Sequence, residues 1–312
     1  MIILLGASGY IGTAFEATLR KKGLAFLSVS RARCDYTRAE PLRDLLLTCK
    51  PELVINSAGY TGKPNVDACE TNRLATLEGN VLFPQRLSIV CAELKIPLGH
   101  VSSGCIFTGC HVWGKDGWRI HTNINSPEVR KAAQVSPSLL RGYTEDTSPN
   151  FTFENQSSFY SGTKALGELK VMAQGDNYVW RLRMPFDEED HSRNYLTKLQ
   201  TYAKVYNSLN SLSHRMEFAN SCIDSWKKRI PFGIYNMTNP GFVSTQEVVA
   251  MICARLKPRR SFIFWKDDAE FYQYGAVAPR SNCILETSKL TRAGVYVRTV
   301  HEALAESLRN WR

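Results

Sequence analysis

A tyrosine and a lysine four residues apart could carry acid–base chemistry in this chain. They are Tyr160 and Lys164, and residues at this spacing share one face of a helix. A neighbouring ammonium group favours the phenolate, so we expect Lys164 to lower the pKa of Tyr160 from its usual value of about 10. The phenol could then protonate an alkoxide as a ketone is reduced. The same spacing also occurs on ordinary solvated helix faces, so other elements must supply a cofactor, a substrate and a third group.

That third group is predicted at the end of a buried strand. The apolar residues 97–101 read as a strand, and Ser103, Gly104 and Cys105 follow it. A hydroxyl group at this point would polarise a carbonyl while the tyrosine handles the proton. The pattern therefore predicts a set of Ser103, Tyr160 and Lys164.

The beginning of the chain predicts a dinucleotide site. Residues 1–5 are an apolar run typical of a strand buried on both faces of a parallel sheet. Three glycines spaced Gly-x-x-Gly-x-x-Gly follow at once, and residues 13–22 read as a helix. Glycines permit a tight turn and a close backbone approach, and the helix N-terminus faces the pyrophosphate. The residues expected to surround the pyrophosphate are Gly6, Ser8, Gly9, Tyr10, Ile11 and Gly12.

The end of the second predicted strand, 25–29, favours NADPH over NADH. An NAD site usually has an acidic residue here for the ribose hydroxyls. This chain instead has Ser30 and Arg31, followed by Arg33. A hydroxyl and a guanidinium suit a 2′-phosphate, although both arginines could simply be surface residues. Asp35 is expected to face the adenine side.

The third predicted strand, 53–55, continues the cofactor site and leads to a loop. Small residues after it let the backbone lie against the cofactor, and the expected contacts are Asn56, Ala58, Gly59 and Tyr60. Loops at the carboxyl edge of such a sheet bind ligands, and here Lys63, Asn65 and Asp67 are the candidates for substrate. Asn80 lies in a predicted helix, 72–90, where it is either exposed or braces Lys164 through a water.

The overall composition indicates an ordinary globular protein. The chain has 312 residues, 44% of them hydrophobic and 22% charged, and a formal net charge of +10. The basic residues are dispersed and form no arm or nucleic-acid motif, so we expect no nucleic-acid partner and interpret the charge as favourable for phosphate-bearing small molecules. No apolar run reaches the roughly 20 residues of a membrane span. We therefore expect a cytoplasmic protein without a membrane or metal partner.

The order of the predicted elements indicates an α/β fold. We expect a Rossmann-type doubly wound parallel sheet in residues 1–185 and a smaller C-terminal substrate domain in residues 186–312. Residues near 233–238 read as a strand that returns to the sheet. Between 108 and 155 no regular pattern is evident. We interpret about residues 109–150 of this stretch as an insertion or lid.

These motifs together resemble an extended short-chain dehydrogenase/reductase. Segments 59–70, 104–107, 181–185, 238–241 and 278–282 are similar to one branch of it, the nucleotide-rhamnose synthase/epimerase-reductases. The resemblance covers the chain except about residues 109–142, where this sequence is longer. It implies conversion of UDP-4-keto-6-deoxy-D-glucose to UDP-β-L-rhamnose, by inversion at carbons 3 and 5 and reduction at carbon 4 with NADPH.

The resemblance also implies roles for further residues. Cys105 and Lys198 match acid/base residues for the two inversions, although a buried cysteine is more often a small apolar residue. Acidic residues that dehydratases of this superfamily carry are replaced by Gly104 and Cys105. Arg280 is expected to bind the diphosphate through charge-assisted bonds, the alternative being a salt bridge. The complete set of expected substrate contacts is Lys63, Asn65, Asp67, Ser103, Gly104, Cys105, Arg183, Pro185, Asn194 and Arg280.

Two other functions stay open at the level of sequence. One is a 4-ketoreductase alone, similar to dTDP-4-dehydrorhamnose reductases, with epimerisation carried out elsewhere. The other is a non-catalytic subunit that keeps the dinucleotide fold to bind a partner, although such a module need not retain Ser103, Tyr160 and Lys164. By analogy with related folds we expect a homodimer.

Overall fold

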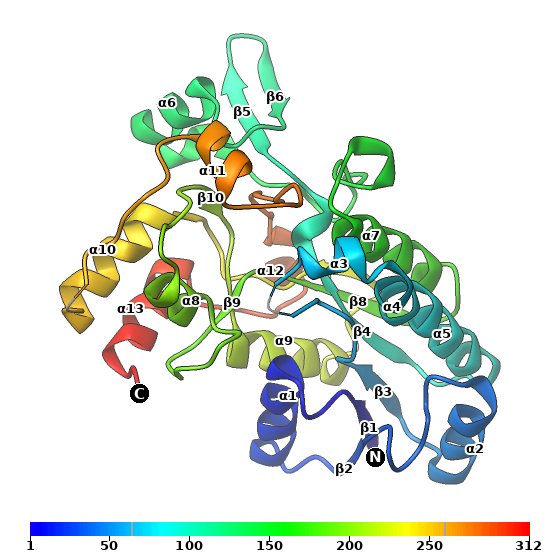
Figure 1. The fold of residues 1–312 in the computed structure, drawn as a ribbon. Coiled ribbons are helices and arrows are strands. Elements are labelled where there is room, and N and C mark those ends of the chain that lie inside the picture. Colours follow the sequence, from blue (N-terminus) through cyan, green and yellow to red (C-terminus); the bar gives the residue numbers. More distant parts are fainter. Residues whose placement is uncertain (64, 259) are drawn as a thin grey trace.

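A computed structural model describes residues 1–63, 65–258 and 260–312. Its centre is a six-stranded sheet in which every neighbouring pair of strands is parallel. The strand order is β12-β8-β4-β3-β1-β2 (Figure 1). The strands are β1 (Ile2–Leu5), β2 (Phe26–Val29), β3 (Leu53–Asn56), β4 (Leu98–Ser103), β8 (Asn177–Leu182) and β12 (Gly233–Asn236). This confirms the predicted doubly wound α/β class.

Helices cover both faces of the sheet, which explains the uninterrupted apolar strands. In β1, Ile2 and Leu4 belong to a core cluster with α1 (Tyr10–Lys21) and α9 (Arg215–Lys227). The alternate residues Ile3 and Leu5 belong to a second cluster on the other face, with α2 (Ala39–Cys49), α5 (Phe83–Glu93) and α7 (Phe159–Met172). Because successive side chains of a strand point to opposite faces, both sets are buried.

The C-terminal part adds a third core beside the sheet. Its helices are α8 (Tyr195–Thr201), α10 (Thr245–Leu256) and α13 (Val300–Arg309), which contribute to one apolar cluster. Short strand pairs join this part together: β9 (Pro185–Phe186) with β11 (Ser213–His214), and β10 (Leu209–Asn210) with β13 (Val243–Ser244). The remaining C-terminal helices are α11 (Asp268–Tyr274) and α12 (Ser288–Arg292). Two elements of the later part belong to the sheet layer: α9 packs on the sheet and β12 extends it. The domain division at residue 185 stays a prediction.

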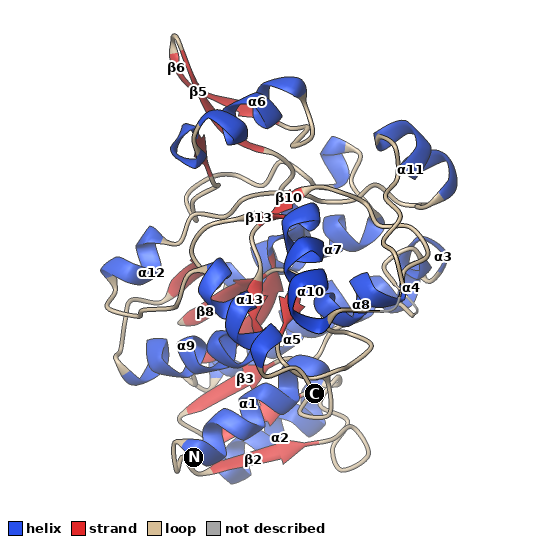
Figure 2. Cartoon of the chain, turned by 90° about the vertical axis from the view of Figure 1, so that its left-hand side faces the viewer, coloured by secondary structure: helices blue, strands red, loops and turns tan. Residues whose placement is uncertain are grey.

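The stretch 108–155 contains regular elements although its sequence shows no regular pattern, and its interpretation as an insertion or lid stays a prediction. It contains a hairpin of β5 (Cys110–Gly114) and β6 (Gly117–His121), then α6 (Pro127–Val135) and β7 (Leu140–Arg141), with its own small apolar cluster. The hairpin projects away from the sheet in both views (Figures 1 and 2). Trp113 and Trp118 are half exposed and pack against each other at 5.3 Å. Because the hairpin is largely solvated, its strands lack the apolar alternation that sequence reasoning relies on.

The segment between β3 and α5 forms α3 (Ala68–Thr71), α4 (Arg73–Leu77) and a π-helical turn, Glu78–Leu82. Short 3₁₀ turns span Gly104–Ile106, Pro137–Leu139 and Phe153–Asn155. Within the described ranges, none of the helices combines the length and apolar character needed to traverse a lipid bilayer.

Candidate active site

The turn after β1 has the geometry of a phosphate-binding turn. Gly6 has a φ of +77°, and a Cβ atom there would lie 2.6 Å from the backbone nitrogen of Ala58. A Cβ atom on Gly12 would lie 2.0 Å from the Gly6 carbonyl oxygen. Helix α1 begins at Tyr10, and no described side chain caps its first N–H groups. The turn therefore fits the pyrophosphate of a dinucleotide, since free N–H groups at a helix N-terminus attract anions.

The end of β2 fits a phosphate as well. Ser30, Arg31 and Arg33 are all exposed, so their side chains are accessible to a 2′-phosphate. Asp35, expected near the adenine, instead accepts bonds from the hydroxyl and N–H groups of Thr37, at 2.5 and 3.3 Å. These bonds lower the pKa of Asp35, and they give the carboxylate a local structural role.

Strand β4 and helix α7 bring the predicted reactive groups together at the carboxyl edge of the sheet. The Ser103 hydroxyl accepts a bond from the Cys105 N–H at 3.2 Å. Burial raises the pKa of both Cys105 and Tyr160, and the Ser103 hydroxyl opposes this rise. Ser158 caps the start of α7, and Lys164 follows Tyr160 by one turn. Lys164 is buried and donates to the Val101 carbonyl at 3.1 Å.

The pKa of Tyr160 differs from the expectation. Burial raises it, and the neighbouring thiols of Cys105 and Cys69 act in the same direction. Burial also lowers the pKa of Lys164, and this ammonium is directed at Val101. The predicted depression of the Tyr160 pKa by Lys164 is therefore wrong for this structure, because desolvation outweighs the attraction.

Asn80 clamps the loop after β3 to the rest of the site. Its side chain is buried, accepts from the Tyr60 N–H and donates to the Tyr60 carbonyl, both at 2.9 Å. It also donates to the Thr163 hydroxyl, at 3.3 Å, on α7. The alternative of an exposed Asn80 is therefore wrong, and the water-mediated brace for Lys164 stays a prediction. Asn56 has a comparable role, since it accepts from the Ala58 N–H and contacts His100 at 3.1 Å.

Two expected substrate residues form an ion pair with each other. Arg280 donates to both carboxylate oxygens of Asp67 at 2.6 Å, and the two side chains are one-fifth exposed. Burial opposes the charge on Asp67, but the bonds from Arg280 and Ala278 still lower its pKa. In the same loop Asn65 accepts from the Asp67 N–H at 2.8 Å. Lys63 is exposed, and Pro64 of the 59–70 segment lies outside the described residues.

Arg183 and Asn194 are buried and engaged by the protein. Arg183, at the end of β8, donates to Asn210, at 3.1 Å from Nε, and to the Ser281 carbonyl, at 2.6 Å. Asn194 caps α8 and donates to the carboxylate of Asp187 at 2.9 Å. Their predicted contacts with substrate stay predictions. Pro185 is partly exposed in β9, and Gly104 packs against Leu285.

A cavity of about 210 Å³ lies beside Arg280. Its walls include Tyr272 and Asp268 from α11, Tyr206, and Thr122 and Ile124 from the segment after the β5–β6 hairpin. Thr108 and Phe151 also line it, and the Phe151 N–H donates to the carbonyl of Ile106, next to Cys105. One wall of the cavity is thus attached to the 3₁₀ turn that carries Cys105.

Two groups were not anticipated from the sequence. Arg193 donates to the Gly62 carbonyl at 3.0 Å. Burial and the charge of Arg193 lower the pKa of Lys198, whereas for Tyr160 the same charge opposes the rise that burial causes. Lys198 is half-buried and close enough to Arg193 to be affected by its charge, and the predicted role of Lys198 stays a prediction. Glu168 forms a buried ion pair with Arg181 and accepts from Ser102 at 2.9 Å. Glu168 lies four residues after Lys164, and this spacing could have predicted that both side chains share one face of α7.

The chain is similar in sequence to a known protein family and to several named proteins. The family model of the RmlD substrate binding domain matches residues 1–312. A trifunctional UDP-glucose 4,6-dehydratase/UDP-4-keto-6-deoxy-D-glucose 3,5-epimerase/UDP-4-keto-L-rhamnose-reductase of Arabidopsis thaliana is 32% identical over 97% of this chain, which spans 40% of that protein. A bifunctional dTDP-4-dehydrorhamnose 3,5-epimerase/dTDP-4-dehydrorhamnose reductase of the same plant is 31% identical, over 97% of this chain and 90% of that protein.

Solved structures share the fold. The crystal structure of the L780 UDP-rhamnose synthase from Acanthamoeba polyphaga mimivirus has a TM-score of 0.81 and 24% identity, with 99% of this chain and 98% of that chain covered. A dTDP-4-dehydrorhamnose reductase from Bacillus anthracis, solved in complex with NADP, has a TM-score of 0.76 and 16% identity, covering 99% of this chain and 97% of the other. At these identities the likeness concerns the fold.

Proposed function

Because the chain belongs to the family of the RmlD substrate-binding domain, we propose that it reduces the 4-keto group of a deoxysugar nucleotide with NADPH. One observation carries this proposal. The chain places Ser103, Tyr160 and Lys164 at the same sheet edge as a glycine turn shaped for a dinucleotide. The activities in the names of the plant relatives, each of which includes a reductase, support it.

The residues of the chain then have defined roles. When bound, NADPH supplies a hydride to carbon 4 of the sugar. Tyr160 donates its phenolic proton to the ketone oxygen, and burial keeps the proton on Tyr160 until then by raising the pKa. Ser103 donates a hydrogen bond to the same oxygen, and Lys164 holds the nicotinamide ribose. The basic end of β2, Ser30 and Arg31, favours NADPH over NADH.

More specifically, we propose that the chain is a bifunctional 3,5-epimerase/4-ketoreductase that converts UDP-4-keto-6-deoxy-D-glucose to UDP-β-L-rhamnose. Protons beside a ketone are acidic enough for side chains to remove. Cys105 lies beside Tyr160 and Lys164, and Lys198 lies on the substrate side near Arg193. Burial lowers the pKa of Lys198, which makes a neutral amine more accessible for proton transfer. The nucleoside is assigned to the cavity beside Arg280.

The test is incubation with UDP-4-keto-6-deoxy-D-glucose and NADPH in deuterated water, with the product identified by NMR. We expect UDP-β-L-rhamnose with deuterium at carbons 3 and 5. Consumption of NADPH without deuterium, or consumption only with the 3,5-epimerised 4-keto sugar nucleotide, would favour the 4-ketoreductase alone. No consumption with either substrate would favour a non-catalytic subunit. The expected homodimer belongs to this proposal too, and light scattering during size-exclusion chromatography would measure its mass.

The role of Cys105 is tested by a Cys105→Ala variant. Without the thiol, we expect deuterium incorporation to be lost at one of the two carbons, because the acid/base for that carbon is missing. Cys253→Ala is the matched control, since Cys253 is exposed on α10. If the Cys105→Ala variant still labels both carbons, Cys105 is not an epimerisation residue.

A further inference from the structure

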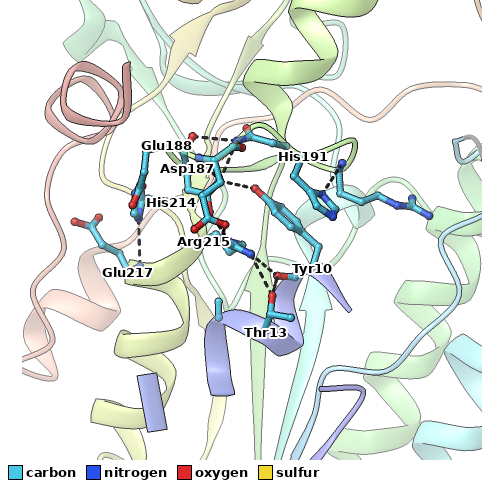
Figure 3. Close-up of polar contacts among 12 residues, drawn as sticks. Tyr10, Thr13, Asp187, Glu188, His191, His214, Arg215 and Glu217 are labelled. Carbon is cyan, nitrogen blue, oxygen red and sulfur yellow. Dashed lines mark hydrogen bonds and ion pairs between the residues drawn. The ribbon is translucent and has the colours of Figure 1, made fainter. Parts of the chain in front are cut away.

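The phosphate-binding turn is attached to a distant segment of the chain through Tyr10. The Tyr10 phenol donates to the carboxylate of Asp187 at 2.9 Å. Its ring stacks on the His191 imidazole, with centroids 4.6 Å apart and planes 9° apart. Figure 3 shows the three side chains gathered between α1 and the segment 187–194, which connects β9 to α8. The Tyr10 side chain therefore contacts segment 187–194 and not only its own turn.

Arg215, the first residue of α9, closes the cluster. Its Nε atom lies 2.5 Å from the Asp187 carboxylate, and one terminal nitrogen donates to the Tyr10 carbonyl and to the Thr13 hydroxyl, both at 3.2 Å. The guanidinium also lies 4.5 Å from the centre of the Tyr10 ring. Asp187 is fully buried, and a buried charge is stable only when it is paired. Arg215 therefore fixes both Asp187 and the backbone at the start of α1.

Asp187 continues the connection to α8. The carboxylate oxygen that accepts from Tyr10 also accepts from the Asn194 amide at 2.9 Å. The same Asn194 side chain caps α8 by accepting from the Leu196 N–H at 2.9 Å. Helix α8 carries Lys198, so one carboxylate oxygen joins the phosphate-binding turn to the start of the helix on the substrate side.

His191 provides a second connection. Its Nδ1 atom accepts from the backbone N–H of Arg193 at 3.0 Å. The Arg193 guanidinium donates to the Gly62 carbonyl at 3.0 Å and influences the pKa of Tyr160 and Lys198. If the Tyr10 ring moved, the stacked His191 imidazole would move with it and shift the backbone of Arg193.

We propose that Tyr10, Asp187 and Arg215 form a latch that couples dinucleotide binding to sugar-nucleotide binding. The proposal rests on the proposed function for the identity of the two ligands. Occupation of the phosphate-binding turn orders Tyr10, and the latch then holds segment 187–194 in the arrangement that presents Arg193 and α8 to the sugar nucleotide. The three are positioning residues, and the coupling is reciprocal between the two ligands.

Calorimetry on the full chain tests the latch, with UDP titrated in the absence and in the presence of saturating NADP⁺. For the unmodified chain we expect NADP⁺ to tighten UDP binding at least about fivefold. Tyr10→Phe removes only the phenolic oxygen and keeps the ring, and we expect it to reduce this ratio to less than about twofold. Asp187→Asn should have the same effect, and the double variant should add little because both act on one contact.

Tyr235→Phe is the matched control, because it removes a phenol that donates to the Pro231 carbonyl at 2.7 Å and to no residue of the latch. A purely structural role of Tyr10 predicts a lower Tm in both variants and an unchanged ratio. A ratio that is unchanged in Tyr10→Phe, or near one in the unmodified chain, overturns the latch alone. Failure of the unmodified chain to bind either ligand overturns the latch and the proposed function together.

Discussion

Burial, more than the neighbouring Lys164, sets the pKa of Tyr160. Tyr160 lies beside the thiols of Cys105 and Cys69, and burial raises its pKa while the Ser103 hydroxyl opposes the rise. A phenol with a raised pKa stays protonated at neutral pH. This is the state that a proton donor to a reduced ketone requires. Tyr160 is therefore in the protonation state that the proposed reduction requires.

Substitution of Tyr160 by Phe tests this assignment at the residue scale. The variant keeps the ring but cannot donate a proton, so we expect kcat for ketone reduction to fall by about 10²- to 10⁴-fold. NADPH affinity should change little, and stopped-flow absorbance with fluorescence titration measures both. Tyr178→Phe serves as the control, because the Tyr178 phenol bonds to the Ile230 carbonyl away from the site. Equal rates for Tyr160→Phe and the unmodified chain would rule out the proton-donor role.

At the scale of elements, the site depends on the close packing of α7 against the π-helical turn Glu78–Leu82. A Cβ atom on Gly167 would lie 1.9 Å from the Asn80 carbonyl oxygen. The side chain of the same Asn80 holds the backbone of Tyr60. The distance between α7 and the turn therefore sets the position of Tyr60 and of the loop after β3 relative to Lys164.

Gly167→Ala should separate these two elements. An alanine inside a helix ordinarily stabilises it by about 1 kcal/mol relative to glycine. Here the methyl group meets backbone, so we expect a loss of about 1 to 3 kcal/mol in the free energy of unfolding and weaker NADPH binding. Chemical denaturation measures the first quantity. Leu169→Ala, at an exposed position of the same helix, is the control that should change stability little.

At the scale of the whole molecule, the acidic segment 187–190 joins distant parts of the chain. Its backbone exchanges hydrogen bonds with Arg312, which donates to the Glu188 carbonyl at 2.9 Å and accepts from the Asp190 N–H at 2.8 Å. The Glu188 carboxylate lies 3.5 Å from His214 at the start of α9. The hydrogen bond with His214 lowers the pKa of Glu188 to about 2. The N-terminal turn, α9 and residue 312 thus meet at one segment.

This pairing predicts a pH dependence of stability. The pKa of Glu188 is about 2 in the folded protein and 4.5 in its unperturbed state, so its contribution is complete above pH 4.5 and is lost as the pH falls toward 2. We expect Glu188→Gln to lower the free energy of unfolding by about 1 to 2 kcal/mol at pH 6, with a smaller difference at pH 3. Urea titrations at the two pH values measure this.

Glu93→Gln is the control for this experiment, because Glu93 forms a more exposed ion pair with Arg43 and such pairs contribute little. A difference between the unmodified chain and Glu188→Gln that stays constant from pH 6 to pH 3 would contradict the assigned pairing.

The sequence by itself determined the features that depend on neighbours along the chain. Apolar residues 2–5, the glycines at 6, 9 and 12, and the spacing of Tyr160 and Lys164 each specify a strand, a turn or a helix face locally. Such short-range patterns are set by backbone sterics and by the period of the element. They were sufficient to predict the α/β class and the edge of the sheet at which the candidate site lies.

Only the tertiary structure decided the burial, the pKa values and the ion-pair partners of those residues. The direction of the Tyr160 pKa depends on burial and on Cys69, and the pairing of Asp67 with Arg280 joins positions 213 residues apart. Tyr10 and Asp187 are likewise 177 residues apart. Desolvation and ion pairing act through space between elements that the fold brings together, and no local pattern encodes them. The β5–β6 hairpin was not predicted for a related reason: Cys110 and Val112 of β5 are buried only against α6 and its neighbours, and β6 is largely exposed.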